Sequence, residues 1–208
     1  MTNDHHDIRR EYHGGPLKRV DLDPDPHVQF SGWLQAALDD NLTDATAMSL
    51  ATATAEGRPS VRIVLLKAHS EEGFIFYSDG RSQKGKELVS NPQAEMLFHW
   101  REQERQVRIQ GPVAPISRKD ALAYFNSRPL SSRQSAAASE QSAVIANRAS
   151  LEAKVSKLDD EIECPPDWGG YCLVAEKFEF WQGRESRLHD RFVYVREGSG
   201  WDIQRLQP

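Results

Sequence analysis

Short strand-like segments, separated by turn residues, follow one another through the middle of the chain and constrain its fold more than any other feature. Residues 47–54 and 61–67 are apolar and rich in β-branched side chains, and they flank a turn at 55–58. Further strand-like runs occupy residues 73–78, 95–100 and 106–116. Strands joined by short turns pair antiparallel. We therefore expect an antiparallel meander rather than a parallel doubly wound sheet.

Helical patterns surround this block. After Pro26, which suits a first helical turn, apolar residues recur with helical spacing. Further helices are predicted at 82–90, 118–127 and 150–162, whereas the Ser- and Ala-rich residues 131–142 are predicted to form a mobile loop or lid. Three more strands are expected at 171–181, 191–195 and 201–206. About seven strands and several helices favour an α+β, barrel-like domain.

Breakers at 14–16 and 23–26 indicate a flexible segment over residues 1–25, so the expected single domain spans 26–208. The net charge of −5 argues against a general nucleic-acid binder but permits local basic pockets. No apolar run approaches the roughly 20 residues of a membrane span. The polar start of the chain does not resemble a secretory signal, and the spacing of Cys164 and Cys172 indicates reduced thiols. We expect a cytoplasmic protein without a metal site.

A basic stretch near the C-terminus, residues 187–191, is the strongest local indication of a ligand site. If it is extended, Arg187, His189 and Arg191 project from one face, while Leu188 points the other way. Arginine offers paired donors to phosphate oxygens, and histidine can exchange a proton near neutral pH. A solvated edge strand is the alternative interpretation.

Three other clusters have similar double interpretations. Arg62 and Lys67 are five residues apart, so an ideal strand would place them on opposite faces unless Lys67 lies past its end. Lys84 follows a predicted helix start, where free N–H groups favour phosphate. Tyr124 and Arg128 are four apart on a predicted helix and precede Ser132, a candidate second phosphate cradle. Ordinary surface or packing roles are the alternatives in each case.

Taken in order, these segments resemble the pyridoxine/pyridoxamine 5′-phosphate oxidase family. The resemblance runs from Arg9-Arg10-Glu11-Tyr12 to the last residue, through 62–67, 104–107, 124–129, 141–142, 168–171, 179–183 and 187–191. It implies a split β-barrel and a homodimer that binds FMN at the subunit interface. It also implies oxidation of pyridoxamine or pyridoxine 5′-phosphate to pyridoxal 5′-phosphate, with O2 as acceptor and H2O2 as product.

The resemblance also assigns residues to the site. The implied flavin contacts are Arg62, Ile63, Val64, Leu65, Leu66, Lys67, Tyr77, Ser78, Gln83, Lys84, Gln106, Gln141, Ser142, Trp181 and Arg191. The implied substrate contacts are Lys67, Tyr124, Arg128, Ser132, Arg187, Leu188 and His189, with Arg9, Arg10, Glu11 and Tyr12 in a segment that can fold over the site as a lid. Arg187 and His189 are the implied catalytic residues, because they would fix the pyridine ring over the flavin.

Two departures from the family pattern stand out. Gln83 occupies a position that usually holds arginine, and residues 133–138 replace a run that usually holds Gly and Trp. Two alternatives accompany the main interpretation. One is a sibling split-barrel flavin oxidase for another planar substrate, such as a phenazine precursor. The other is a non-catalytic flavin or pyridoxal-phosphate binding protein.

Overall fold

The structure is a computed structural model that describes residues 4–7 and 10–208. The chain divides into two compact units. Unit 1 comprises residues 1–46, 96–109 and 176–208, and unit 2 comprises residues 47–95 and 110–175. Strands β5 (Gln93–Trp100) and β6 (Arg105–Pro115) have residues in both units. Within the described residues, no helix combines the length and the apolar character that a membrane crossing requires.

Unit 1 is an antiparallel sheet with one long helix. Its strands follow the order β10-β9-β8-β6-β5. The elements not yet given are η1 (Arg19–Asp21), α1 (Pro26–Asp39), β8 (Lys177–Gln182), η2 (Glu185–Arg187), β9 (Asp190–Glu197) and β10 (Gly200–Leu206). Strands β8 and β9 pair so that Trp181 lies opposite Arg191. This register places both side chains at the same end of the sheet.

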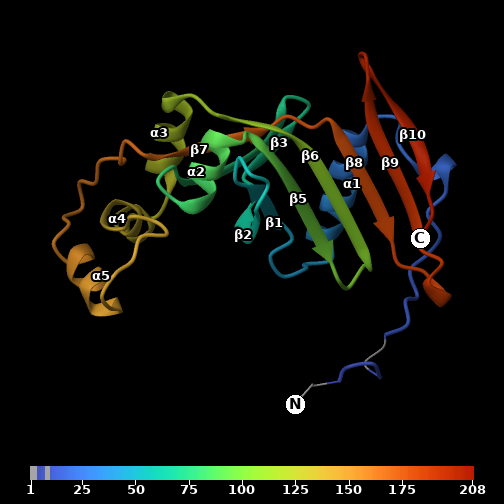
Figure 1. The fold of residues 1–208 in the computed structure, drawn as a ribbon, viewed down its shortest axis with the longest axis horizontal. Coiled ribbons are helices and arrows are strands. Elements are labelled where there is room, and N and C mark those ends of the chain that lie inside the picture. The colour runs from blue at the N-terminus through green and yellow to red at the C-terminus, as the bar shows by residue number, and fades with distance from the viewer. Residues whose placement is uncertain (1–3, 8–9) are drawn as a thin grey trace. The chain divides into compact units, whose positions relative to one another are not determined.

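Helix α1 lies against this sheet (Figure 1). Aromatic side chains make the contact between them. The carboxylate of Asp25 caps its N-terminus by accepting from the His27 N–H, and Pro26 needs no such partner. Phe30 meets Phe98 of β5 with ring centroids 5.0 Å apart, and Trp33 meets Phe180 of β8 at 5.3 Å. Burial of each such side chain contributes about 1.5–3 kcal/mol, so the helix holds this sheet firmly.

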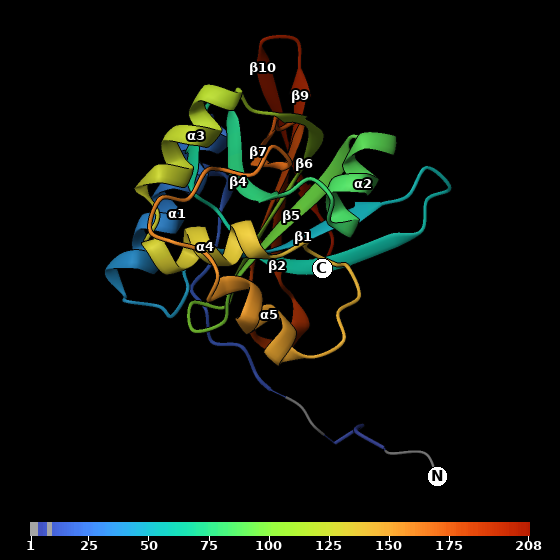
Figure 2. The ribbon, with the colours of Figure 1, turned by 90° about the vertical axis from the view of Figure 1, so that its left-hand side faces the viewer.

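Unit 2 contains the other strands and four helices. The strands are β1 (Ala47–Ala53), β2 (Pro59–Leu65), β3 (Ala68–Ser70), β4 (Gly73–Asp79) and β7 (Trp168–Leu173). The helices are α2 (Gln83–Ser90), α3 (Arg118–Ser127), α4 (Leu130–Ala138) and α5 (Arg148–Val155). Antiparallel pairing joins β1 to β2, and it joins β3, β4, β7 and β6 in that order. Helices α4 and α5 lie side by side (Figure 2).

A small aromatic cluster connects α3, α4 and β7. Phe125 and Trp168 are buried in it together with Ile162. Tyr77 of β4 stacks on Tyr124 of α3, with ring centroids 3.8 Å apart. These rings form a rigid wall of unit 2 beside α3 and α4.

Most predicted elements are confirmed, with three corrections. The predicted strand 171–181 is two strands, β7 and β8. The predicted loop 131–142 contains helix α4, because alanine favours the helix more than any other residue. The predicted helix 150–162 ends at Val155, since Leu158 and Ile162 pack on the aromatic cluster from a non-helical segment.

Candidate active site

A cavity of about 840 Å³ in unit 2 collects most of the residues that the sequence singled out. The predicted residues in its lining are Arg62, Ile63, Val64, Leu65, Lys67, Tyr77, Ser78, Gln83, Lys84, Tyr124, Arg128, Ser132, Gln141 and Ser142. Leu66 lies outside this lining and is buried in the core. Four cationic side chains among these described residues make the cavity suitable for anionic groups.

The position at which β2 ends explains how Arg62 and Lys67, five residues apart, reach the same cavity. Arg62 lies within β2, whereas Lys67 lies two residues past its last residue, Leu65. The Lys67 N–H donates to the carbonyl of Ile75 at 2.8 Å, so the chain has already turned toward β4. Both cations therefore reach one cavity.

Lys84, on the first turn of α2, is a buried cation whose contacts are neutral. Its Nζ donates to Gln141 Oε1 at 2.7 Å, to Ser78 Oγ at 2.9 Å and to Ser82 Oγ at 3.3 Å. Burial lowers the pKa of Lys84, and the charge of Arg62 lowers it further. A buried ammonium with only neutral acceptors is costly unless an anion joins it. This chemistry fits a phosphate group.

Glu87, on the same helix, organises the neighbouring side chains. It accepts hydrogen bonds from Ser60 at 2.6 Å, from Gln83 at 2.9 Å and from Thr52, and it pairs with Arg62 at 3.4 Å. Burial alone would raise its pKa, but these donors and the Arg62 charge lower the pKa of Glu87 from 4.5 to about 2. Sequence reasoning missed Glu87, although its position four residues after Gln83 was a usable signal.

The loop after α4 closes this part of the cavity. Ser142 Oγ accepts from the Gln83 N–H at 3.2 Å, and Ser78 Oγ donates to Gln141 Oε1 at 3.0 Å. The altered residues 133–138 belong to α4, so they form a helical wall rather than the predicted loop. Ser135 and Ala136 of this wall line the cavity.

Arg128 is a second cation of the cavity, half-buried, with one guanidinium nitrogen fully buried. The residue caps the C-terminus of α3 in an extended conformation (φ −76°, ψ 151°), so the prediction that it shares a helical face with Tyr124 is wrong. Its guanidinium lies 4.9 Å from the Trp168 ring, and the NH1 atom is buried without a hydrogen-bond partner. Burial lowers the pKa of Arg128. An unpaired guanidinium N–H can donate to an anionic ligand. Tyr124 and Ser132 line the same cavity and can contact that ligand too.

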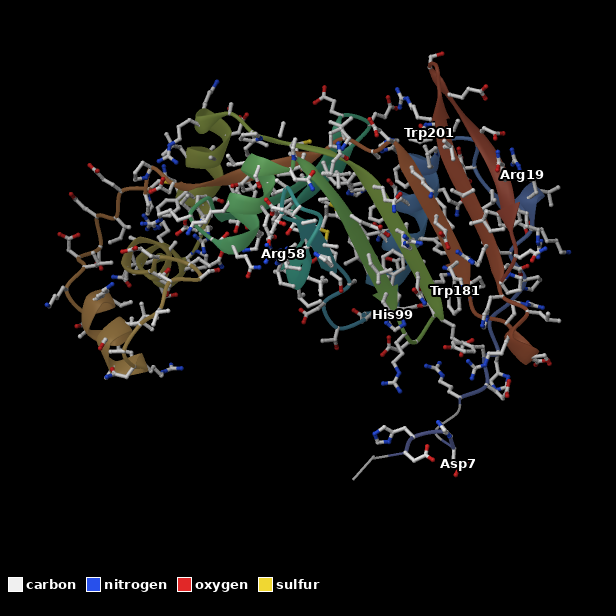
Figure 3. All side chains as sticks on the ribbon, in the orientation of Figure 1. Asp7, Arg19, Arg58, His99, Trp181 and Trp201 are labelled. Atoms are coloured by element: carbon white, nitrogen blue, oxygen red, sulfur yellow. The ribbon has the colours of Figure 1, made fainter. Side chains whose placement is uncertain are left out.

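Unit 1 carries a second hollow, of about 240 Å³, lined by Gln106, Arg108, Glu179, Trp181, Arg191 and Pro208. Three of these, Gln106, Trp181 and Arg191, were predicted to contact the flavin; Trp181 is labelled in Figure 3. The buried carboxylate of Glu179 accepts from Arg191 Nε at 2.9 Å and from Arg108 NH1 at 3.1 Å. Glu179 therefore fixes two guanidinium groups at the edge of this hollow, a role that sequence reasoning missed.

The predicted extended conformation of residues 187–191 is wrong. Trp181 pairs with Arg191 and Gln182 with Asp190, so the residues between them must form the connection from β8 to β9. That connection contains η2, with φ of 53° at Ser186 and 61° at Arg187, and β9 begins only at Asp190. The alternation argument therefore fails for Arg187, Leu188 and His189, and so does the edge-strand alternative.

His189 nevertheless has a defined environment within this connection. Its Nδ1 accepts from the backbone N–H of Arg184 at 3.1 Å, which places the proton of the neutral ring on Nε2. Burial lowers the pKa of His189, and the charge of Arg187 adds to this effect. The rings of Trp181 and Tyr12 lie 4.7 Å and 5.1 Å away. His189 is thus a neutral hydrogen-bond donor through Nε2.

The N-terminal segment of unit 1 packs against Trp181 and His189. Tyr12 packs edge-on against Trp181, and Arg10 pairs with Glu104 at 2.8 Å. Glu11 is exposed, and Arg9 lies outside the described residues. Of the three predicted lid residues that the structure describes, Tyr12 lies against His189.

Comparison with known proteins places most of the chain in one family. Residues 34–160 match the family described as pyridoxamine 5′-phosphate oxidase, and residues 168–208 match the pyridoxine 5′-phosphate oxidase C-terminal dimerisation region. A pyridoxine/pyridoxamine 5′-phosphate oxidase of Deinococcus deserti is 50% identical and covers 97% of each chain. One from Paraburkholderia phymatum is also 50% identical, over 97% of this chain and 98% of that one.

Two solved structures share the fold. PhzG from Burkholderia lata 383, solved with tetrahydrophenazine-1-carboxylic acid, superposes with a TM-score of 0.88 at 30% identity, covering 94% of this chain and 99% of that one. A pyridoxamine 5′-phosphate oxidase-related, FMN binding protein from Nostoc punctiforme superposes with a TM-score of 0.71 at 21% identity, covering 90% and 100%.

Fold and site together define an FMN-binding split β-barrel of the α+β class, as predicted, with FMN as its cofactor. The buried ammonium of Lys84, which donates to neutral oxygens, fits the phosphate of that cofactor. Within this class the chain belongs to the pyridoxamine 5′-phosphate oxidase family and is an oxidoreductase.

Proposed function

We propose that the protein oxidises pyridoxamine 5′-phosphate or pyridoxine 5′-phosphate to pyridoxal 5′-phosphate, with O2 as acceptor and H2O2 as product. C4′ of the substrate loses two electrons, and O2 gains two electrons and two protons. With the amine substrate, water supplies the aldehyde oxygen and ammonia leaves. The observation that carries the proposal is that one cavity holds two cations without an anionic acceptor. The buried Lys84 ammonium donates to neutral oxygens, and the half-buried Arg128 has a buried NH1 atom with no hydrogen-bond partner.

Each cation serves one phosphate in this proposal. Lys84, with Ser78, Gln141 and Ser142 around it, holds the phosphate of FMN. Arg128, Tyr124, Ser132 and Lys67 hold the phosphate of the substrate. Arg62 is tied to Glu87, so it shapes the flavin site as a fixed donor rather than a mobile counter-ion. The apolar residues 63–66 supply backbone and packing contacts along β2 and the turn that follows it.

Holding the substrate phosphate at a distance from the reacting carbon lets binding energy orient the pyridine ring. The redox chemistry would be supplied by bound FMN, as the acceptor of a hydride from C4′ and the donor of the electrons to O2. His189, neutral with its proton on Nε2, donates a hydrogen bond to the ring substituents without adding a charge. Arg187 supplies the positive charge beside it. His189 and Arg187 are therefore proposed to orient and polarise the substrate.

We further propose that FMN binds between two copies of the chain. Residues 168–208 match the dimerisation region of the family. Strand β2 exposes an apolar stripe, with Val61 68%, Ile63 66% and Leu65 41% exposed, as expected for a surface that another chain covers. In this arrangement Gln106, Trp181 and Arg191 of the unit 1 hollow complete the flavin site of the dimer.

The test is reconstitution and substrate comparison. The protein is loaded with FMN, and peroxide formation is followed with pyridoxamine 5′-phosphate and, separately, with unphosphorylated pyridoxamine. Turnover with a much lower KM for the phosphorylated substrate is expected. An FMN-loaded protein that oxidises neither compound would overturn the proposal and leave either an oxidase for another substrate or a non-catalytic binder.

The likeness to PhzG supports a second candidate, oxidation of a reduced phenazine precursor. A substrate without phosphate does not need the cradle of Arg128, Tyr124 and Ser132. Arg128→Met therefore separates the two functions. It should slow pyridoxamine 5′-phosphate oxidation about 10- to 150-fold, the loss expected for one charge-assisted hydrogen bond, and leave oxidation of a phosphate-free precursor unchanged.

A further inference from the structure

The N-terminal segment 10–14 is held by one buried carboxylate, that of Glu104 between β5 and β6. We propose that Glu104 is a positioning residue: it fixes segment 10–14 so that Tyr12 covers His189 and Trp181. The inference rests on the proposed function in one respect only, namely that His189 and Trp181 belong to the substrate and flavin sites.

Both oxygens of the Glu104 carboxylate are used by this segment. Oε1 accepts from Arg10 NH2 at 2.8 Å, and Oε2 accepts from the backbone N–H groups of His13 and Gly14, each at 2.7 Å. Burial would raise the pKa of Glu104, but the His13, Gly14 and Arg10 donors lower it, so the carboxylate stays ionised. Three donors converge on one carboxylate from a segment about 90 residues away in the sequence. Such charge-assisted bonds hold a chain segment more strongly than neutral ones.

Two glycines leave the space that this docking requires. A Cβ on Gly183 would lie 2.5 Å from Tyr12 Cδ1 and 3.0 Å from Glu104 Cβ. A Cβ on Gly14 would lie 2.3 Å from Gln182 Nε2 and 2.6 Å from the Gly183 carbonyl oxygen. The packing of segment 10–14 against Gln182 and Gly183 therefore leaves no room for a side chain at either glycine.

The docked segment also contacts the residue that fixes His189. Arg184 NH1 donates to the Gly14 carbonyl at 3.0 Å, while the Arg184 backbone N–H donates to His189 Nδ1 at 3.1 Å. Tyr12 lies edge-on to the His189 ring at 5.1 Å, with an interplanar angle of 84°. Loss of the Glu104 charge would release segment 10–14 and uncover one side of His189. It would also free Arg184, whose backbone N–H keeps the proton of the neutral His189 ring on Nε2.

The direct test is limited trypsin digestion of full-length, FMN-loaded protein, with cleavage after Arg10 followed by mass spectrometry. Glu104→Gln is the test variant, and Glu102→Gln, an exposed glutamate in the same turn, is the matched control. We expect cleavage after Arg10 to become at least 10-fold faster in Glu104→Gln and to stay unchanged in Glu102→Gln. If both variants are cleaved at the parental rate, the anchoring role is refuted whether or not the proposed reaction is correct, because no substrate is involved.

Kinetics then separate positioning from mere anchoring. Glu104→Gln should raise the KM for pyridoxamine 5′-phosphate several-fold while FMN affinity is unchanged, and it should add nothing in a Tyr12→Ala background. Faster cleavage with unchanged kinetics would refute the positioning role. If Glu104→Gln fails to fold, Gly183→Ala displaces Tyr12 while the carboxylate stays, and it should give the same two changes; parental values for Gly183→Ala would overturn the proposal.

Discussion

Replacement of Lys84 by methionine should weaken FMN binding through the phosphate alone. The ammonium is buried and bonded to Ser78 and Gln141, so it is already desolvated and oriented before the anion arrives. A hydrogen bond between charged groups contributes about 1.5–3 kcal/mol, which corresponds to about a 10- to 150-fold rise in the FMN dissociation constant. The upper half of that range is expected because no further desolvation of the cation is required.

The assay is titration of the apoprotein with FMN and with riboflavin, which lacks the phosphate, followed by flavin fluorescence. Lys86→Met is the matched control, since Lys86 lies on the same helix but is exposed. FMN should bind more weakly to Lys84→Met, whereas riboflavin should bind as it does to the parent protein. Equal weakening of both flavins would show that Lys84 supports the cavity rather than the phosphate, and the reasoning would fail.

Three further predictions follow from the same contacts. Arg128→Met should mainly raise the KM for pyridoxamine 5′-phosphate, while Arg187→Met should mainly lower kcat; equal effects on kcat alone would contradict this division of labour. Glu87→Gln should destabilise the protein by about 3–5 kcal/mol in urea unfolding at pH 7, as for a broken buried ion pair. The folded pKa of Glu87 lies below its usual value, so its contribution to stability is full above about pH 4.5 and is lost as the pH falls toward 2. The difference in unfolding free energy between parent and variant should therefore be smaller at pH 3 than at pH 7. A difference that stays constant would refute the stabilising role of the Glu87 carboxylate. In an NMR titration the midpoint of His189 should fall below the usual 6.5, so that the ring stays neutral to lower pH, and a midpoint above 6.5 would contradict the burial argument.

The sequence predicted those site residues whose chemistry is visible locally. Lys84 was found because it follows a helix start, and Tyr124 and Arg128 because of their spacing, even though Arg128 lies just past the helix. The carboxylates that hold other cations, Glu87 with Arg62 and Glu104 with Arg10, were missed. Thr52 and Glu87 are 35 residues apart, and Glu104 meets a segment about 90 residues earlier, so only the folded chain shows them as partners.

Errors in the fold have the same origin. Residues 187–191 look extended as a pattern, but the pairing of Trp181 with Arg191 forces them into a connection. Residues 150–162 look like one amphipathic helix, but Leu158 and Ile162 are apolar because they pack on the cluster around Phe125 and Trp168. In both cases a tertiary contact, rather than a local preference, sets the conformation.

The central claim is that this flavoprotein makes pyridoxal 5′-phosphate and gives the electrons to O2. The most direct measurement follows pyridoxal 5′-phosphate and peroxide together during aerobic turnover of the FMN-loaded protein with pyridoxamine 5′-phosphate. We expect equal amounts of the two products, and turnover should stop when O2 is removed. A flavin-loaded protein that forms no pyridoxal 5′-phosphate, or forms it without peroxide, would refute the proposed reaction.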